Sequence, residues 1–68
     1  MTPGMKIKIA RIQRHKKQYQ FARELGISRE YLRLIESDKA KNPSTDLMKK
    51  IAEQLETKVG ALFFDEEV

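Results

Sequence analysis

The sequence contains no cysteine and no tryptophan, one histidine and two prolines, and it has no long apolar run. Without cysteine the chain forms no disulfide and no cysteine-ligated zinc site, and a single histidine argues against any other structural metal site. No stretch approaches the roughly 18 apolar residues of a membrane-spanning helix, and the start of the chain is too short and too polar for a signal peptide. We therefore expect a cytoplasmic protein that is held together by its core alone, without metal or cofactor.

The chain is also short, with 68 residues, of which 40% are hydrophobic and 35% are charged. This length lies below the roughly 100 to 200 residues of an average domain, so we expect one domain over residues 1–68. A domain of this size has little room for a deep substrate cleft. The sequence also shows no paired carboxylates on a helix face, no Ser/His/Asp set and no phosphate-cradling glycine loop. We therefore expect neither an enzyme nor a binding site for a small-molecule ligand.

Acidic residues are missing from the start of the chain. Residues 1–17 carry six basic side chains and no acidic one, whereas residues 44–68 carry three basic and six acidic ones, and the net charge is +4. Solvated helix faces can produce such a pattern, but a cationic end also fits a footprint for phosphate. A basic helix on a membrane surface is a third interpretation. It is weakened because the segment lacks the large aromatic or leucine face that such helices need.

Helical periodicity, capping residues and helix breakers divide the chain into five short helices, with almost no strand signal. The fourth helix has the clearest period, with apolar residues on one face and polar residues on the other. The inward face of the first stays open, because two apolar stripes run along it. The pattern thus predicts an all-α fold, a compact bundle of five short helices. The expected helices are Pro3 or Met5 to about His15, Gln18 to Leu25, Arg29 to about Ser37, Ser44 or Thr45 to about Glu56, and a last short turn that Thr57 can cap. We expect the acidic end, residues 65–68, to fray.

The second and third expected helices are joined by a short turn that contains glycine. Gly26 ends the second helix, because glycine most easily takes the left-handed conformation found at helix ends, and Ser28 can cap the third. Thr2 can cap the first helix in the same way. Two helices joined in this manner form the helix-turn-helix pattern that places a helix in the major groove of DNA. The pattern spans residues 18–36.

The segment reads QYQFARELGISREYLRLIE, and it resembles the Cro and phage-repressor-like helix-turn-helix family, widely called the XRE family. The family pattern is Gln, three residues, Ala, three residues, Gly, an apolar residue, Ser or Thr, and then an apolar pair that ends before Glu. The resemblance covers almost the whole chain and implies a lambda-repressor-like DNA-binding domain. The matching residues are Gln18, Ala22, Gly26, Ile27, Ser28, Leu32, Ile35 and Glu36.

The expected partner of this pattern is double-stranded DNA. The free N–H groups and the dipole at the start of the second helix attract phosphate, and Gln18 adds an amide donor there. In the third helix, Leu32 and Ile35 are expected to pack in the core. Four other residues are then left on the outer face, where the base edges would lie. The arginines suit guanine, the glutamate suits cytosine and the leucine suits a thymine methyl group. The alternative for the arginines is a solvated face or a contact with phosphate only, and the alternative for the glutamate is that it simply favours the start of the helix. These expected base-reading residues are Arg29, Glu30, Arg33 and Leu34.

The resemblance also implies roles for residues outside the base-reading set. It implies that Lys39, Lys41 and Asn42, in the loop after the third helix, hold the DNA backbone, although solubility alone also accounts for the lysines. It further implies that Arg11 and Glu36 form a partly buried salt bridge between the first and third helices. Their role would then be structural rather than in DNA binding.

Some positions depart from the family pattern. His15, Lys16 and Lys17 stand where the family has an apolar staple and the usual cap of the second helix, which predicts a mobile entry into that helix. Leu34 stands where the family usually has a long polar residue. Asp38 would be unfavourable near a phosphate unless its side chain points away from the DNA.

Together these patterns predict a sequence-specific transcriptional regulator, a repressor that binds a palindromic operator as a homodimer. One recognition helix spans few base pairs, so useful specificity needs two half-sites about 34 Å apart. Phe63 and Phe64 directly follow Leu62, and one helical turn cannot bury three large adjacent side chains, so we expect the dimer interface there. An alternative from a different class is a protein-interaction or antitoxin-type module that binds another protein through the Leu34 face or through the two phenylalanines.

Overall fold

The computed structural model describes residues 1–40 and 42–64, and these residues form five helices and no strand, so the predicted all-α fold is confirmed. Two sequence predictions, the DNA contact of Lys41 and a frayed acidic end at residues 65–68, lie outside the described residues. The helices are α1 (Pro3–Gln13), α2 (Gln18–Leu25), α3 (Arg29–Glu36), α4 (Thr45–Gln54) and α5 (Val59–Phe63).

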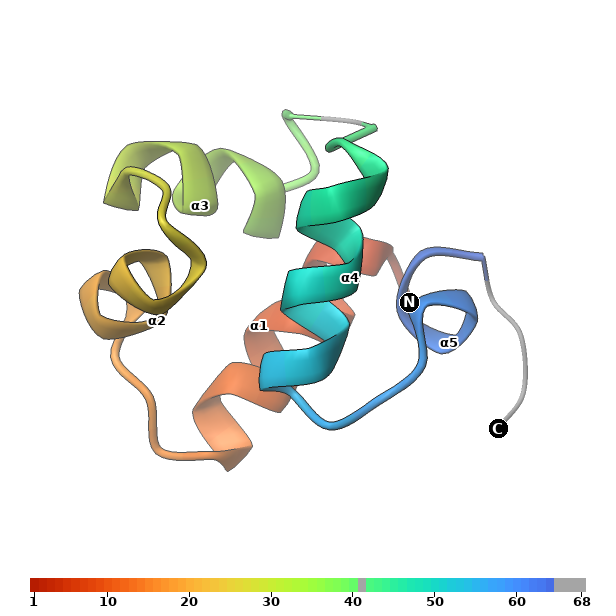
Figure 1. Ribbon diagram of the computed structural model, residues 1–68, viewed down its shortest axis with the longest axis horizontal. Helices are drawn as coiled ribbons and strands as arrows, with labels where there is room; N and C mark the ends of the chain where they lie inside the picture. Colours follow the sequence, from red (N-terminus) through yellow and green to blue (C-terminus); the bar gives the residue numbers. More distant parts are fainter. Residues whose placement is uncertain (41, 65–68) are drawn as a thin grey trace.

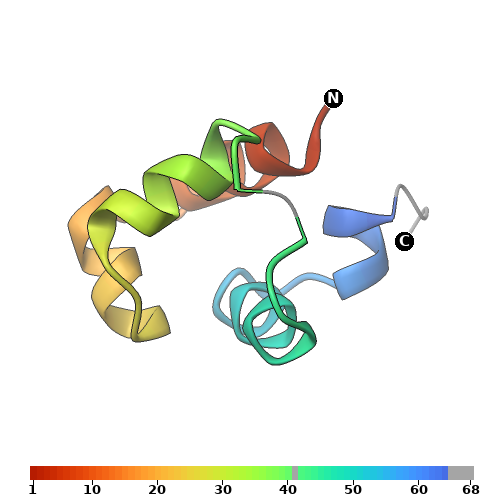
Figure 2. The same cartoon turned by 90° about the horizontal axis from the view of Figure 1, so that it is seen from above.

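The helices surround one apolar core. In Figure 1, α4 stands in front of α1, with α2 and α3 on one side of it and α5 on the other, and Figure 2 shows α3 lying against α1. Each of the first four helices contributes at least one fully buried large side chain, and burial of such a side chain is worth about 1.5 to 3 kcal/mol. The largest fully buried side chains are Phe21, Ile7, Leu25, Leu32 and Ile51.

The inward face of α1, which periodicity leaves open, is the one formed by Gly4, Ile7 and Arg11. Ile9 and Ile12, on the other stripe, are 36% and 53% exposed. Since the buried stripe contains a glycine and an arginine, the more hydrophobic of the two stripes faces solvent. The direction of α1 is therefore set by its contacts with other helices and not by its own hydrophobicity.

Gly4 lies at a close crossing between α1 and the end of α3. A Cβ atom on Gly4 would lie 2.5 Å from the carbonyl oxygen of Ile35 and 2.6 Å from that of Glu36, so a larger residue does not fit without movement of the backbone. Asp38, just beyond α3, accepts hydrogen bonds from the Gly4 N–H at 2.9 Å and from the Thr2 hydroxyl. Its carboxylate thus lies at the positive end of the α1 dipole, where negative charge is favourable. The Asp38 side chain therefore points toward the start of α1.

The caps predicted at Thr2 and Ser28 are present and Ser44 caps α4 in the same way, whereas α5 begins at Lys58 without a side-chain cap and not at a cap by Thr57. The side-chain oxygens of Thr2, Ser28 and Ser44 each accept the N–H three residues ahead, at the starts of α1, α3 and α4. At α2 the Lys17 side chain has no acceptor. Instead, the side chain of Gln20 accepts the Lys17 N–H at 2.9 Å, which is one half of a capping box.

The ends of α1, α3 and α4 come one or two residues earlier than predicted, at residues 13, 36 and 54 in place of 15, 37 and 56. Two residues beyond these ends, His15, Asp38 and Glu56 have φ angles of 57°, 63° and 52°. The next N–H along the chain then bonds to a carbonyl five residues earlier, as it does after Gly26 at the end of α2. This conformation costs about 1 to 2 kcal/mol for a residue other than glycine. None of the three positions carries glycine, so the sequence does not signal these helix ends in the way that Gly26 signals the end of α2.

Candidate nucleic-acid interface

The corner between α2 and α3 has the geometry that the turn residues predict. Gly26 adopts the left-handed conformation, with φ of 74°, and the Ile27 N–H bonds to the Ala22 carbonyl at 3.0 Å. Ala22 itself is 2% exposed, and its small side chain allows the two helices to approach each other. The Ser28 hydroxyl accepts the Tyr31 N–H at 3.0 Å and begins α3. Since both ends of the turn are hydrogen-bonded, α3 is held at a defined angle to α2.

One side of α3 is locked in the core and the other faces solvent. Leu34, one of the predicted base-reading residues, is half-buried at the edge of the exposed side, and Tyr31 is half-buried against the core. The buried residues are Leu32, Ile35 and Glu36. The exposed residues are Arg29, Glu30 and Arg33.

Two of the exposed residues are paired with each other. The Arg33 guanidinium donates from Nε to Glu30 Oε1 at 2.9 Å and from Nη2 to Glu30 Oε2 at 2.6 Å. These hydrogen bonds lower the pKa of Glu30, and the positive charges of Arg33 and Lys39 lower it further. The same hydrogen bonds raise the pKa of Arg33 above its ordinary value. In the free protein, Arg33 is therefore held by a neighbour on its own helix.

Arg11 and Glu36 form an ion pair inside the protein, as the family resemblance implies. Arg11 Nε donates to Glu36 Oε2 at 2.7 Å and Arg11 Nη2 donates to Glu36 Oε1 at 3.1 Å. The two side chains are only 9% and 3% exposed. Arg11 Nη1 also donates to the Lys16 carbonyl at 2.8 Å. The pair thus joins α1, the loop before α2 and the end of α3.

Gln18, the predicted phosphate contact, connects this ion pair to the surface. Its Nε2 donates to Glu36 Oε1 at 3.1 Å, and its Oε1 accepts from Arg29 Nε at 3.4 Å. Gln18 is half-buried as the first residue of α2. A continuous series of hydrogen bonds therefore runs from Arg11 in the core to Arg29 on the exposed side of α3.

The loop after α3 is anchored to the end of that helix. The N–H groups of Lys39 and Ala40 both bond to the Leu34 carbonyl, at 2.9 and 3.0 Å. Lys39 and Asn42 are exposed, and Asn42 has a φ of 56°. Pro43, which follows, is buried. Lys39 and Asn42, the two predicted contacts with the DNA backbone in the described part of this loop, therefore face solvent.

Comparison with known protein families identifies this arrangement. The Helix-turn-helix family model matches residues 7–62, which is most of the chain and includes every helix from within α1 to α5. The chain belongs to the Cro- and XRE-like helix-turn-helix family. The predicted resemblance is thereby confirmed, and the protein is a DNA-binding helix-turn-helix regulator. No curated protein and no solved structure matches the chain.

The helix-turn-helix regulator has a further exposed pair that the sequence analysis does not single out. Tyr19, the second residue of α2, is 43% exposed, and the Arg23 guanidinium carbon lies 6.0 Å from the centre of its ring. This distance allows a cation–π contact. The spacing of four residues within a helix is the sequence signal that could have predicted the contact.

The end of α5 shows how the helix-turn-helix regulator arranges its adjacent large apolar residues. Leu62 is buried, Phe63 is half-buried against the core, and Phe64 is 62% exposed. One of the two phenylalanines expected at a dimer interface is thus largely accessible.

The described residues of this regulator offer no group of three or more His, Cys, Asp or Glu side chains that could hold a metal ion. None of the helices in residues 1–40 and 42–64 is long and apolar enough to span a membrane.

Proposed function

We propose that this helix-turn-helix regulator is a repressor that binds a palindromic operator in double-stranded DNA as a homodimer, with α3 in the major groove. The observation that carries the proposal is the exposed side of α3, where Arg29, Glu30 and Arg33 face solvent from a helix whose other side is buried. Residues 1–68 act as one DNA-binding domain, which works in the cytoplasm without a cofactor.

In this proposal α3 reads the bases. Guanine offers two acceptors, O6 and N7, that match an arginine guanidinium, and the cytosine amino group donates to a carboxylate. A guanine next to a cytosine on the groove wall therefore suits the neighbouring Arg33 and Glu30. Leu34 contacts a thymine methyl group from the edge of the exposed side. Arg29 reads a second guanine, held in position by Gln18.

Other residues contact the DNA backbone. The start of α2 presents free N–H groups and a positive dipole, which bind phosphate without reading sequence. Gln18 lies at this point. Its Nε2 donates one N–H to Glu36 Oε1 and can donate the second to a phosphate oxygen, while its Oε1 keeps the contact with Arg29. Lys39, Lys41 and Asn42 hold the next stretch of backbone.

The experiment that tests the DNA proposal selects bound sequences from a pool of random duplexes and then measures affinity as a function of salt. We expect a palindromic motif with half-sites about one helical turn apart. The log–log salt slope should be about −0.9 for each phosphate contact, and Lys39→Gln should reduce its size by about 1. Lys58→Gln is the matched control, because Lys58 is exposed at the start of α5, away from α3 (Figure 1).

Arg33→Gln should relax the preferred base at one position in each half-site and leave the salt slope nearly unchanged. The absence of duplex binding even at low salt, or a selection that yields no motif, would contradict the proposal.

The dimer in this proposal forms through Phe63 and Phe64. A largely exposed phenylalanine beside the half-buried one provides apolar area that self-association would cover. Phe64→Ser should weaken self-association in sedimentation experiments and weaken operator binding, while circular dichroism shows an unchanged helical fold. Tyr19→Ser, which removes another exposed aromatic ring, is the control for self-association. An unchanged dimer dissociation constant in Phe64→Ser would place the interface elsewhere.

A further inference from the structure

Three of the six large apolar side chains that are exposed in the described part of the chain lie on α1. They have the spacing i, i+4 and i+7, so they share one face of the helix. These three, Met5, Ile9 and Ile12, are called the outer stripe; they are 45%, 36% and 53% exposed. The large apolar residues exposed in the described part of the chain are Met1, Met5, Ile9, Ile12, Tyr19 and Phe64.

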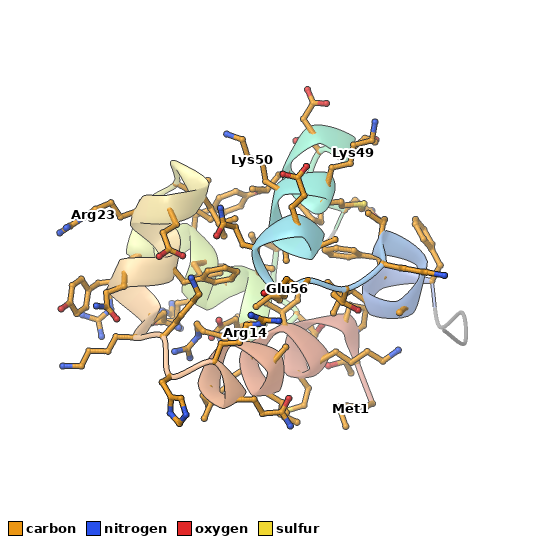
Figure 3. All side chains as sticks on the ribbon, turned by 60° about the horizontal axis from the view of Figure 1, so that its bottom comes forward. Met1, Arg14, Arg23, Lys49, Lys50 and Glu56 are labelled. Atoms are coloured by element: carbon orange, nitrogen blue, oxygen red, sulfur yellow. The ribbon has the colours of Figure 1, made fainter. Side chains whose placement is uncertain are left out.

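The outer stripe lies on the far side of α1 from the rest of the protein. The opposite face of α1, with Gly4, Ile7 and Arg11, is buried, and α1 packs against α3 and α5. Figure 3 shows α1 along one edge of the molecule, with Met1 at the same edge and no other helix beyond it. The outer stripe therefore points away from α3 and is not used in the proposed contact with DNA.

The surroundings of the outer stripe are cationic. Lys8 is exposed beside the outer stripe, three residues after Met5 and four before Ile12, and the described residues provide no ion-pair or hydrogen-bond partner for its side chain. Beyond the end of α1 follows the exposed Lys17, whereas Lys16 is paired with Glu24 at 2.6 Å. Residues 1–17 contain no acidic side chain. An apolar stripe with one sign of charge at its rim is complementary to an apolar surface with the opposite charge at its rim.

We propose that the outer stripe is a docking site for an amphipathic helix of another protein, with Asp or Glu side chains at the edges of its apolar face. Apolar residues at i, i+4 and i+7 are the anchors by which helices bind apolar grooves and faces. Lys8 would pair with the partner's carboxylates. Because the outer stripe faces away from α3, this partner can bind the regulator while DNA is bound, and the proposal does not depend on the DNA proposal.

Two other occupants fit the surface less well. A second copy of the chain, laid antiparallel across Ile9, would bring the two Lys8 side chains together, and like charges at an interface are unfavourable. A lipid surface needs a broad apolar face, whereas the outer stripe is narrow because the other side of α1 is buried in the core.

The test uses the full chain and two synthetic helical peptides of about 16 residues. One peptide carries leucines on one face and glutamates on both edges, and the other has lysines in place of the glutamates. Amide chemical shifts of the protein are followed by NMR during each titration. We expect saturable shifts confined to residues 5–12 with the acidic peptide and none with the basic peptide. Ile9→Glu should weaken binding of the acidic peptide about tenfold or more, and Lys8→Glu should reverse the preference between the peptides.

Controls separate this surface from the others. Phe64→Ser should bind the acidic peptide as the original chain does. Ile9→Glu should keep the helical circular dichroism, since position 9 is exposed, and should keep its duplex affinity and salt slope. Equal binding of both peptides, shifts centred on Phe64, or binding of phosphatidylserine vesicles in place of the acidic peptide would overturn the proposal.

Discussion

Removing one partner of the buried ion pair should destabilise the protein about as much as removing both. Arg11 and Glu36 are 9% and 3% exposed and share hydrogen bonds of 2.7 and 3.1 Å. In Arg11→Met, the Gln18 amide is the one donor that the described residues still offer to the Glu36 carboxylate. In Glu36→Leu, the Lys16 carbonyl is the one acceptor within residues 1–40 and 42–64 that the Arg11 guanidinium keeps. Each single change therefore leaves a buried charge without its counter-charge.

The size of the effect follows from the burial of both groups. Breaking a buried pair on one side costs about 3 kcal/mol, and in a chain of this length each kcal/mol lowers Tm by about 4 to 8 °C, which gives a loss of about 12 to 24 °C. The double variant carries neither charge. It removes the acceptor of Gln18 Nε2 and the Arg11 donor of the Lys16 carbonyl, at about 1 kcal/mol each. We expect the double variant to cost about 2 to 3 kcal/mol, whereas additive single effects would amount to about 6 kcal/mol.

The measurement is a double-mutant cycle of urea unfolding followed by circular dichroism, with a stabilising osmolyte for any variant that is unfolded in buffer. The control is the more exposed ion pair of Lys16 and Glu24. Lys16 Nζ lies 2.6 Å from Glu24 Oε1, and the two side chains are 23% and 39% exposed. Its cycle, with glutamine at either or both positions, should give a coupling below about 1 kcal/mol. Additive effects of Arg11→Met and Glu36→Leu would refute the reasoning from burial.

Other positions give separate tests. Gly4→Ala should cost about 1 to 3 kcal/mol, because the added Cβ meets backbone carbonyl oxygens of α3, and an unchanged thermal melt would mean that α1 moves away freely. His15→Gly should stabilise the protein by about 1 kcal/mol, since glycine adopts the left-handed backbone without steric cost; a loss of stability would contradict that backbone. In an NMR titration, the pKa of Glu30 should lie below the ordinary glutamate value and should return toward it in Arg33→Gln. The ion pair is therefore intact at a pH above the ordinary pKa and is lost as the pH falls through the lowered pKa. A Glu30 pKa that is the same in both proteins would exclude the pair. Leu34→Gln should change the preferred base at one position of each half-site at a cost of about 1 to 3 kcal/mol, and identical motifs from selection would remove Leu34 from base reading.

The helix-turn-helix segment is the part of the fold that sequence predicts best. The expected bounds of α2, Gln18 to Leu25, agree with the structure, because Gly26 and the spacing of apolar residues act locally. The ends of α1, α3 and α4 could not be predicted in this way. There, His15, Asp38 and Glu56 adopt a conformation that these residues seldom take, and the neighbouring packing determines it.

In the candidate site, too, the features that follow from local spacing can be predicted from sequence, whereas those that depend on long-range contacts cannot. Exposure of the arginines on α3 follows from periodicity, and the contact of Glu30 with Arg33 is a pair at i and i+3 that spacing alone suggests. The inward hydrogen bond of Gln18 depends on Glu36, which is 18 residues away. The orientation of α1 depends on Gly4, whose close contact exists only once the end of α3 is in place. These features require the assembled tertiary structure.

In the proposed complex with DNA, the contact between Glu30 and Arg33 affects how operators are told apart. There Arg33 turns to a guanine, and the Glu30 carboxylate loses its two hydrogen bonds and needs a new donor, which only some neighbouring bases provide. The gain from a guanine at one base pair therefore depends on the base pair beside it. We expect operator preferences to be non-additive at these two adjacent positions. A description of the binding site by independent weights for each base pair would then fail there, and a description by dinucleotide steps would succeed.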